Sequence, residues 1–499
     1  MNDRAQQIDL RLAAVLASLL LSAVFYFFTG IPNDDAYTYI RTAEIFLNDG
    51  LTAAIDHYAW VTYPVLIALV SSLGISLLTA AYVLNALFYA LLVYSFVSIV
   101  RLLDDSRLVV ALAALTVLVY PELNEYRDMV IRDVGFWSLS LFGLLQFLLY
   151  DRNRNFRQGL LFVGMLGLAS LFRPEALLYL LLTPISLLFN SSISTEENRK
   201  HLLRLSGVTV LIGAGVLLTL LLVGINVFAL VLDRLAVYQL FLVEVFNPGE
   251  ALLAARSDAI FGEFAADFSR EYVNAVIAAG LLVVLAMTLF YGIGGPYFWL
   301  LAWGLLRKHL PAKGTNVAPV LAYLLINLGL LLVFLYVTRF LTARYAILFS
   351  LLIVLQVPFL VRTIIENIRD SRWKMSAQYF LIMFFFYCAM DAYISLGRPR
   401  DWLMDAAQYV NESNAGNVIT NNLSIAYFSG AVEAYDEVIR VLNADTIRGA
   451  QPGDLLAIEM FYDMRVLVAD PAVAPYLEQI TGFPQQGEQR VAIFRRVAP

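Results

Sequence analysis

The chain has 499 residues, of which 60% are apolar, 13% aromatic and only 15% charged. A soluble chain of this length would fold into several domains, and 34 basic plus 40 acidic residues could not cover their surfaces. The composition therefore indicates a protein that crosses a membrane many times. The formal charge of −6 argues against nucleic acid as a partner, because nucleic-acid binding needs a basic surface.

Cysteine and histidine are too scarce for two common kinds of site. Cys388 is the single cysteine, which excludes a disulfide framework and a thiolate zinc site. The three histidines, His57, His201 and His309, are far apart in the sequence, which argues against a histidine metal centre.

Apolar segments long enough to cross a bilayer recur along most of the chain. Taking about 20 apolar residues per crossing, we predict spans at residues 12–28, 79–100, 108–120, 134–150, 156–172, 174–190, 205–228, 273–292, 317–337, 345–361 and 376–394. The first lacks a signal-peptide cleavage site, so we expect it to be retained. The pattern predicts an all-α polytopic membrane bundle of about eleven, and at most about thirteen, transmembrane helices.

Two segments depart from ordinary spans. Residues 62–78 are apolar but contain Tyr63, Pro64 and Gly74, which predicts a re-entrant or interfacial helix in the first outer loop. Residues 292–296 are rich in glycine and end in a proline, so we expect a break beside the eighth span.

The composition changes near residue 396. The segment that follows is rich in Pro, Gly, Asn and charged residues, which predicts a transmembrane domain at 1–395 and a small soluble α/β domain at 396–499. An amphipathic helix is predicted at 401–410. Short strands are predicted at 417–420, 454–461, 466–469 and 491–495.

The distribution of basic residues predicts the orientation in the membrane. One set of loops holds most of the arginines and lysines, among them Arg101, Arg152 and Arg372, whereas Arg41 is alone in residues 30–60. Loops rich in Lys and Arg face the cytoplasm. We therefore expect a multi-pass membrane protein with its N-terminus in the cytoplasm and its C-terminal domain outside.

Two adjacent carboxylates, Asp34 and Asp35, follow the first span directly. Carboxylates this close to the hydrocarbon are costly unless they are solvated, paired or partly neutralised. Neighbouring carboxylates push their titrations apart, so one can act as a base while the other orients a hydroxyl or helps to bind a divalent metal ion. Alternatively, Asp34 is simply the N-cap of a helix at 36–47, and both roles can hold together.

Further candidate substrate contacts lie in the first two outer loops. Glu125 and Asp128 belong to an acidic cluster after the third span, which either joins the Asp pair in one polar cavity or pairs its charges internally. Glu44, Tyr37 and Tyr63 lie in the first outer loop. The tyrosines can pack against a sugar or, as is common at membrane interfaces, form part of an aromatic belt.

Arginines in the outer loops are candidates for binding a phosphate. Arg173 lies between two adjacent spans, and Arg339 and Arg344 lie in a tight outer turn, with Tyr345 beside the second of them. A guanidinium offers paired donors to a phosphate. The alternative for each arginine is a long side chain that merely anchors a helix end at the interface.

These motifs together resemble a known family. The order is Asp34-Asp35 after the first span, Tyr63-Pro64 before the second, Arg173-Pro174-Glu175 between the fifth and sixth, and Arg344-Tyr345 before a late span. This order resembles the GT-C superfamily of integral membrane glycosyltransferases, in its protein mannosyltransferase-like and aminoarabinose transferase-like branch. The resemblance covers the whole chain.

The resemblance implies transfer of a sugar from a polyprenyl phosphate to an acceptor on the outer face of the membrane, usually with inversion. Asp34 or Asp35 would be the catalytic carboxylate, and Arg344 would bind the donor phosphate. Many relatives have Asp-Glu rather than Asp-Asp at the first position, and the acid of the second loop matches no single residue here.

The chemistry is consistent with that expectation. A phosphate leaving group needs positive charge rather than a proton, and a carboxylate then only has to deprotonate the acceptor hydroxyl. The expected partners are a polyprenyl-phosphate sugar donor, membrane lipids, and an acceptor that is a lipid, a glycan or a protein. The alternative is a transporter or flippase of lipid-linked sugars, whose ionisable residues should lie in mid-span.

Overall fold

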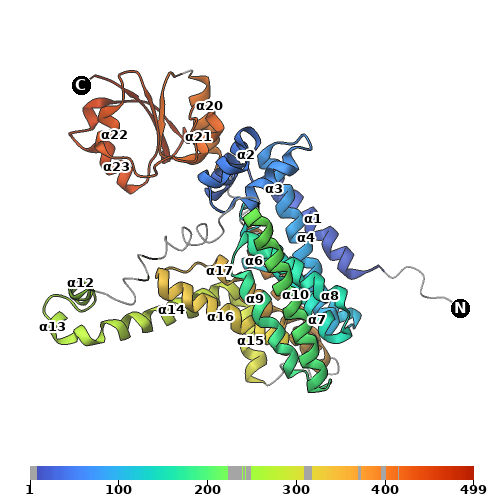
Figure 1. Cartoon of the computed structure of the whole chain (residues 1–499). Helices are drawn as coiled ribbons and strands as arrows, with labels where there is room; N and C mark the ends of the chain where they lie inside the picture. The colour runs from blue at the N-terminus through green and yellow to red at the C-terminus, as the bar shows by residue number, and fades with distance from the viewer. Residues whose placement is uncertain are drawn as a thin grey trace. The chain divides into compact units, whose positions relative to one another are not determined.

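The computed structural model describes residues 8–222, 239, 242, 249–307, 317–368, 372–394, 400–413 and 415–498. The chain divides into two compact units, which are described separately. Unit 1 comprises Met1–Leu19, Leu87–Glu125 and Arg132–Tyr393, and unit 2 comprises Leu20–Ala86, Tyr126–Ile131 and Ile394–Pro499. Figure 1 labels most of the helices along the chain.

Long apolar helices account for most of the described chain. In these residues 8 helices are long and apolar enough to cross a membrane. They are α1 (Leu10–Phe28), α4 (Leu77–Leu103), α7 (Asp133–Asn153), α10 (Thr195–Leu222), α14 (Val273–Ile293), α16 (Ala318–Thr338), α17 (Ala343–Val354) continued by α18 (Val357–Ile368), and α19 (Lys374–Tyr393).

Shorter apolar helices occupy the other predicted spans. They are α5 (Arg107–Leu118), α8 (Phe156–Phe172), and α9 (Ala176–Leu182) continued by the 3₁₀ helix η1 (Thr183–Phe189). Every predicted span therefore contains an apolar helix, although residues 223–228 of the seventh lie outside the described residues. The predicted all-α membrane bundle is confirmed.

Helix α7 is the most buried of the long helices, because 89% of the residues in its most apolar stretch lie inside the protein. It packs closely against α8 because α7 has glycine at the contact. A Cβ atom added at Gly135 would lie only 2.5 Å from the ring of Phe172, the last residue of α8. This close approach brings the end of α8, and Arg173 after it, against the first turn of α7.

The break predicted at residues 292–296 is present. Gly294 has a φ of 82° and separates α14 from α15 (Gly295–Leu306). This left-handed backbone favours glycine, because a Cβ would be strained there. The remaining helices in the described part of unit 1 are α6 (Pro121–Asn124), α12 (Glu250–Phe261), α13 (Ala266–Ser269) and η2 (Arg270–Tyr272).

The connection between α1 and α4, which the sequence predicts to be the first outer loop, contains two helices, as predicted. Helix α2 (Asp35–His57) is interrupted at Gly50, whose φ is 87°, and α3 (Thr62–Ser71) follows it. Both belong to unit 2. Unlike the spans, α2 combines one buried face with several charged residues, which suits a helix that lies on a surface rather than one that crosses a bilayer.

The C-terminal part of unit 2 is the predicted small α/β domain. Its four-stranded sheet has the order β1-β2-β4-β3, with β1 parallel to β2 and the other pairs antiparallel. The strands are β1 (Val418–Thr420), β2 (Leu455–Glu459), β3 (Leu477–Phe483) and β4 (Val491–Arg496). The helices are α20 (Asp401–Glu412), α21 (Leu423–Ser429), α22 (Ala444–Gly449), α23 (Tyr462–Ala469) and η4 (Ala474–Tyr476).

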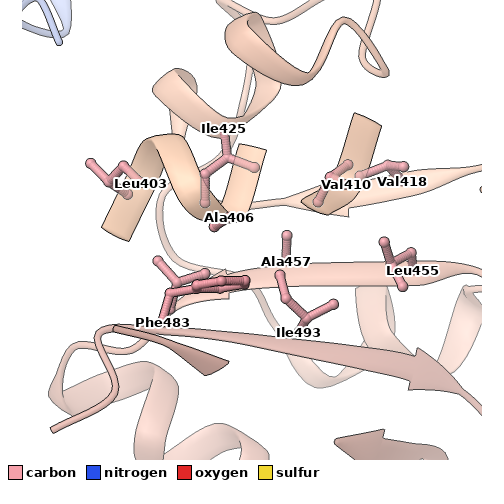
Figure 2. Packing of buried hydrophobic residues seen from close by; sticks show 10 residues of the cluster. Leu403, Ala406, Val410, Val418, Ile425, Leu455, Ala457, Phe483 and Ile493 are labelled. Atoms are coloured by element: carbon pink, nitrogen blue, oxygen red, sulfur yellow. The ribbon is translucent and has the colours of Figure 1, made fainter. Parts of the chain in front are cut away.

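This sheet has an apolar core on each face, because the side chains of its strands alternate between the two faces. Leu455 and Ala457 of β2 pack with Leu403, Ala406 and Val410 of α20, as Figure 2 shows. The intervening Leu456 and Ile458 pack on the opposite face with Met464 of α23 and Phe494 of β4. Side chains of a strand alternate between faces, so one run of apolar residues serves both cores.

Two sequence predictions for this domain need correction. Residues 466–469 form the end of helix α23 and not a strand, because Met464, Leu467 and Val468 recur at helical spacing against the core. Strand β3 was not predicted, because its sequence is largely polar and its pairing shifts between Gln479 and Thr481. The predicted boundary between 395 and 396 lies outside the described residues and stays a prediction.

Candidate functional site

The carboxylate of Asp34 does not cap helix α2. Asp34 stands at the N-cap position, but its side chain makes no capping hydrogen bond and is exposed. The helix begins with backbone bonds instead, in which the N–H of Tyr37 donates to the Asp34 carbonyl at 3.2 Å. Asp35 is the first residue of the helix and is half-buried. The Asp34 carboxylate is therefore open to solvent.

The connection between α5 and α7 meets the connection between α1 and α4 beside this acid pair. The N–H of Val130 donates to Asn33 Oδ1 at 2.7 Å, directly before Asp34. Asn85 Nδ2 donates to the Met129 carbonyl at 2.8 Å, and the hydroxyl of Tyr63 donates to Asn85 Oδ1 at 2.8 Å. These hydrogen bonds fix residues 126–131, which include Asp128, against the start of α2 and against α4, and Tyr63 joins α3 to α4.

Tyr37 and Tyr63 are fully buried. The hydroxyl of Tyr37 donates to Ser424 Oγ of α21 at 2.8 Å, and its ring lies 5.4 Å from that of Tyr427. Burial raises the pKa of Tyr37 far above its usual value. In this structure both tyrosines hold α2 and α3 in place, and their contact with a sugar stays a prediction.

Glu44 lies where α2 meets the C-terminal domain. Its carboxylate is 3.4 Å from Arg41 Nη1, and the guanidinium of Arg41 lies 5.8 Å from the ring centre of Tyr435. Further along α2, His57 Nε2 lies 2.8 Å from the buried carboxylate of Asp436. These contacts join α2 to the C-terminal domain, so Glu44 has a structural role here and its contact with substrate stays a prediction.

In unit 1, Arg173 is the centre of a buried charge cluster. It is 9% exposed, and its Nη1 donates to Asp133 Oδ1 at 2.6 Å. Its Nε lies 3.6 Å from Glu175 Oε1, and its guanidinium lies 4.4 Å from the ring centre of Tyr345. Two carboxylates and one aromatic face therefore orient this arginine.

Arg344 belongs to the same cluster. Its guanidinium lies 5.4 Å from the ring centre of Tyr345, so this ring contacts both Arg173 and Arg344. Burial and the positive charge of Arg344 act to lower the pKa of Arg173, but Asp133 and Glu175 raise it overall. The structure thus brings together Arg173, Arg344 and Tyr345.

Arg339 makes different contacts. It ends α16 in the left-handed conformation, with a φ of 60°, and its guanidinium lies 4.9 Å from the ring centre of Tyr336. Among the described residues, its buried Nη1 has no hydrogen-bond partner. Its binding of a phosphate stays a prediction.

A cavity of about 350 Å³ opens beside the arginine cluster. Arg173, Glu175 and Tyr345 line its polar end, and apolar side chains of α16 line most of the rest. A further cavity of about 800 Å³ is also lined by residues of α16. Its other lining residues belong to the α9–η1 segment, from Leu182 onward, and to residues 190–192. A cavity with charged side chains at one end and a largely apolar lining elsewhere suits an amphiphile that has an anionic head and a hydrocarbon tail.

Sequence reasoning missed the role of Asp133. The signal was available, because Asp133 is the first residue of one span and Arg173 follows the next one. Consecutive antiparallel spans place these two positions at the same end of the bundle. Residues at the facing ends of such a hairpin are therefore candidates for an ion pair.

Three carboxylates meet at another place in unit 1. Burial, followed by the negative charges of Glu125 and Asp391, raises the pKa of Glu122 to about 7. The pKa of Glu125 is also raised, by burial and by Asp391. Glu122 and Asp391 were not predicted as partners, because they are far apart in the sequence.

Replacing Glu122 by Gln should change the pH dependence of stability. A carboxyl whose pKa rises from 4.5 to about 7 on folding binds more protons in the folded state, so wild-type stability should fall as the pH rises through this window. The variant should lose this fall and have a higher apparent Tm at pH 8, on the order of a few degrees. Thermal unfolding from pH 4 to 8 measures it, with exposed Glu433→Gln as the control. Parallel profiles of wild type and Glu122→Gln would contradict the prediction.

The described residues offer few ligands for a divalent metal ion at the Asp pair. In the described part of the chain, no group of three or more His, Cys, Asp or Glu side chains could hold a metal ion. Magnesium often takes only one or two carboxylates from the protein when substrate phosphates supply other ligands. Asp34 and Asp35 would hold a metal ion only in this way, with substrate oxygens as further ligands. Metal binding at the pair therefore stays a proposal that requires bound substrate.

Comparison with solved structures identifies the fold. The chain is similar to the crystal structure of ArnT from Cupriavidus metallidurans bound to undecaprenyl phosphate, with 12% sequence identity, 98% of each chain covered and a TM-score of 0.53. The chain has the fold of ArnT. ArnT is an aminoarabinose transferase of the GT-C class, so the resemblance found in the sequence is confirmed at the level of fold.

A second match is weaker than that to ArnT. It is the cryo-EM structure of the arabinofuranosyltransferase AftD from Mycobacteria, with 13% identity, 98% of this chain and 40% of that chain covered, and a TM-score of 0.45. No family model matches the sequence, and no curated protein does. The ArnT fold, together with the arginine cluster and its cavity, is therefore the basis for a functional proposal.

Proposed function

We propose that this chain is a membrane glycosyltransferase that transfers a sugar from a polyprenyl-phosphate donor to an acceptor at the outer face of a bacterial inner membrane. The observation that carries the proposal is the arginine cluster beside a largely apolar cavity, whose lining includes Arg173 and Tyr345. The ArnT fold supports it, because that protein was crystallised with undecaprenyl phosphate.

In this proposal the arginines bind the phosphate of the donor. Asp133 and Tyr345 hold Arg173 in one orientation, and Arg344 adds a second guanidinium. Fixed positive charge stabilises the phosphate as it departs from the sugar, without a proton being supplied. The prenyl tail would lie in the apolar cavities along α16.

The acid pair supplies the base. An exposed carboxylate at Asp34 can accept the proton of an acceptor hydroxyl as the hydroxyl attacks the sugar carbon that carries the phosphate. One displacement at that carbon inverts its configuration. Asp35 orients the hydroxyl or shares a divalent ion with substrate oxygens. The acceptor is a lipid, a glycan or a protein with a free hydroxyl or amine.

The test uses purified full-length protein in liposomes and a panel of polyprenyl-phosphate sugars with a lipid acceptor fraction. The expected result is release of polyprenyl phosphate together with appearance of the glycosylated acceptor. Movement of the donor across the bilayer without release of polyprenyl phosphate would instead identify a flippase. Omission of divalent ions and addition of EDTA in the same assay test the metal.

The proposal also predicts that the first outer loop and the basic loops lie on opposite sides of the membrane. A cysteine at Asn48, an exposed residue of α2, should react with a membrane-impermeant reagent in intact cells. A cysteine at the exposed Asn153, at the end of α7, should react only after permeabilisation. Cys388 is buried, so it should give little background. The reverse pattern would contradict the orientation and the proposed site together.

A further inference from the structure

A polar cavity of about 620 Å³ lies in unit 1, apart from the arginine cluster of Arg173. It is formed by the ends of α4 and α7, the connection after α4, and the segment that follows η1. Its charged lining consists of Arg101, Arg152, Asp104, Asp105 and Asp151, with apolar side chains such as Leu148 between them. Arg101 and Arg152 belong to loops that the sequence analysis found rich in basic residues.

The floor of the cavity is a fixed polar network. Asp151 and Asn190 are 4% and 7% exposed. Asn190 Nδ2 donates to Asp151 Oδ1 at 3.0 Å, and its own Oδ1 accepts the N–H of Ser192 at 3.0 Å. Arg154 Nη2 lies 3.4 Å from Asp151 Oδ1. The charge of Asp151 is therefore compensated from within the protein, and the floor is rigid.

Other charges at the rim are also compensated. Asp104 accepts hydrogen bonds from Arg362 and from the N–H of Ser106. Arg101 Nη1 lies 3.8 Å from a carboxylate oxygen of Asp9. These contacts leave little charge at either residue for a ligand.

One positive and one negative side chain remain. Arg152 donates only a long bond, of 3.5 Å, to the Leu102 carbonyl, and it is exposed. Asp105 is exposed too. In the described part of the chain, neither has a salt-bridge partner. A ligand that matches this rim carries one anionic and one cationic group.

We propose that this cavity binds the headgroup of a phospholipid that carries a primary ammonium, with the chemistry of phosphoethanolamine. Arg152 holds the phosphate through its guanidinium, and Asp105 accepts hydrogen bonds from the ammonium. The apolar lining contacts the start of the acyl chains. Polar pockets between helix ends on the basic side of a membrane protein are suited to lipid headgroups.

The charge pattern makes the choice of headgroup specific. A headgroup with a phosphate but no cation would leave Asp105 unpaired beside a second anion. A quaternary ammonium has the charge but no N–H to donate, so it cannot form the hydrogen bond to the carboxylate. Phosphatidylethanolamine should therefore bind more tightly than phosphatidylglycerol or phosphatidylcholine with the same acyl chains.

Native mass spectrometry of the purified full-length protein tests this, with each of the three lipids titrated in turn. Phosphatidylethanolamine should bind about tenfold more tightly than the other two, the effect of one charge-assisted hydrogen bond. Glycerophosphoethanolamine, which has the headgroup without the chains, is a fourth arm. Binding of it as tight as that of the lipid would assign the same headgroup chemistry to a soluble ligand.

Variants separate the two charges. Arg152→Ala should weaken the binding of all three lipids, whereas Asp105→Asn should abolish only the preference for phosphatidylethanolamine. Arg157→Ala is the matched control, because Arg157 is an exposed arginine at the start of α8 and does not line the cavity. Equal affinities for the three lipids in the wild type, or an Arg152→Ala variant that binds like Arg157→Ala, would overturn the proposal.

Discussion

Replacement of Asp34 by Asn should lower the rate of sugar transfer by roughly a hundredfold or more. The amide has the size of the carboxyl group but cannot take the proton of the acceptor hydroxyl. The side chain of Asp34 makes no capping hydrogen bond and is exposed, so its loss removes no bond that starts helix α2. Folding and donor binding should therefore stay close to wild type. The measurement is the transfer rate at saturating donor, with the apparent Tm determined on the same preparations.

Two further variants make this result specific. Asp49→Asn changes an exposed aspartate on the same helix and should leave the rate unchanged. Asp35→Asn tests the half-buried neighbour. A large loss in Asp35→Asn with a normal rate in Asp34→Asn would move the base by one residue. Wild-type rates in both would remove the acid pair from the chemistry.

The membrane helices could be predicted from the sequence because one physical requirement dominates them. A backbone in hydrocarbon must satisfy its own hydrogen bonds, so a long apolar run is nearly always a helix. Even the break at Gly294 was visible, since three glycines and a proline interrupt the run. The C-terminal domain has no such constraint. Whether residues 466–469 formed a strand or a helix depended on which core they faced, and only tertiary packing decides that.

The candidate site was predictable in its residue types but not in its pairings. Outer-loop arginines and carboxylates stood out because charges at the membrane edge are costly. The sequence places Arg173 and Asp133 at the same end of a helical hairpin, but that the two side chains pair depends on the packing of α7 on α8 through Gly135. Nor could it show that Tyr37 is covered, since Ser424 of the C-terminal domain is distant in the sequence.

These pairings decide which arginine should be replaced to test phosphate binding. Removing Arg173 would leave the buried Asp133 without its cation, which typically costs about 3–5 kcal/mol, so lost activity could not be separated from lost folding. Arg344 lies in the first turn of α17, is half-buried and stacks beside Tyr345. It is therefore the better test of phosphate binding.

Arg344→Lys should lower kcat/KM for the donor by about tenfold or more, and Arg344→Ala by about a hundredfold or more. Lysine keeps the charge but loses the planar pair of donors that a phosphate accepts, and alanine leaves the departing phosphate without that cation. If Arg344 only anchors the end of α17, lysine should substitute almost freely, because both side chains can reach the interface. Donor affinity and transfer rate at matched expression distinguish the two cases. Normal values for Arg344→Lys with a loss in Arg339→Lys would transfer the phosphate-binding role to Arg339.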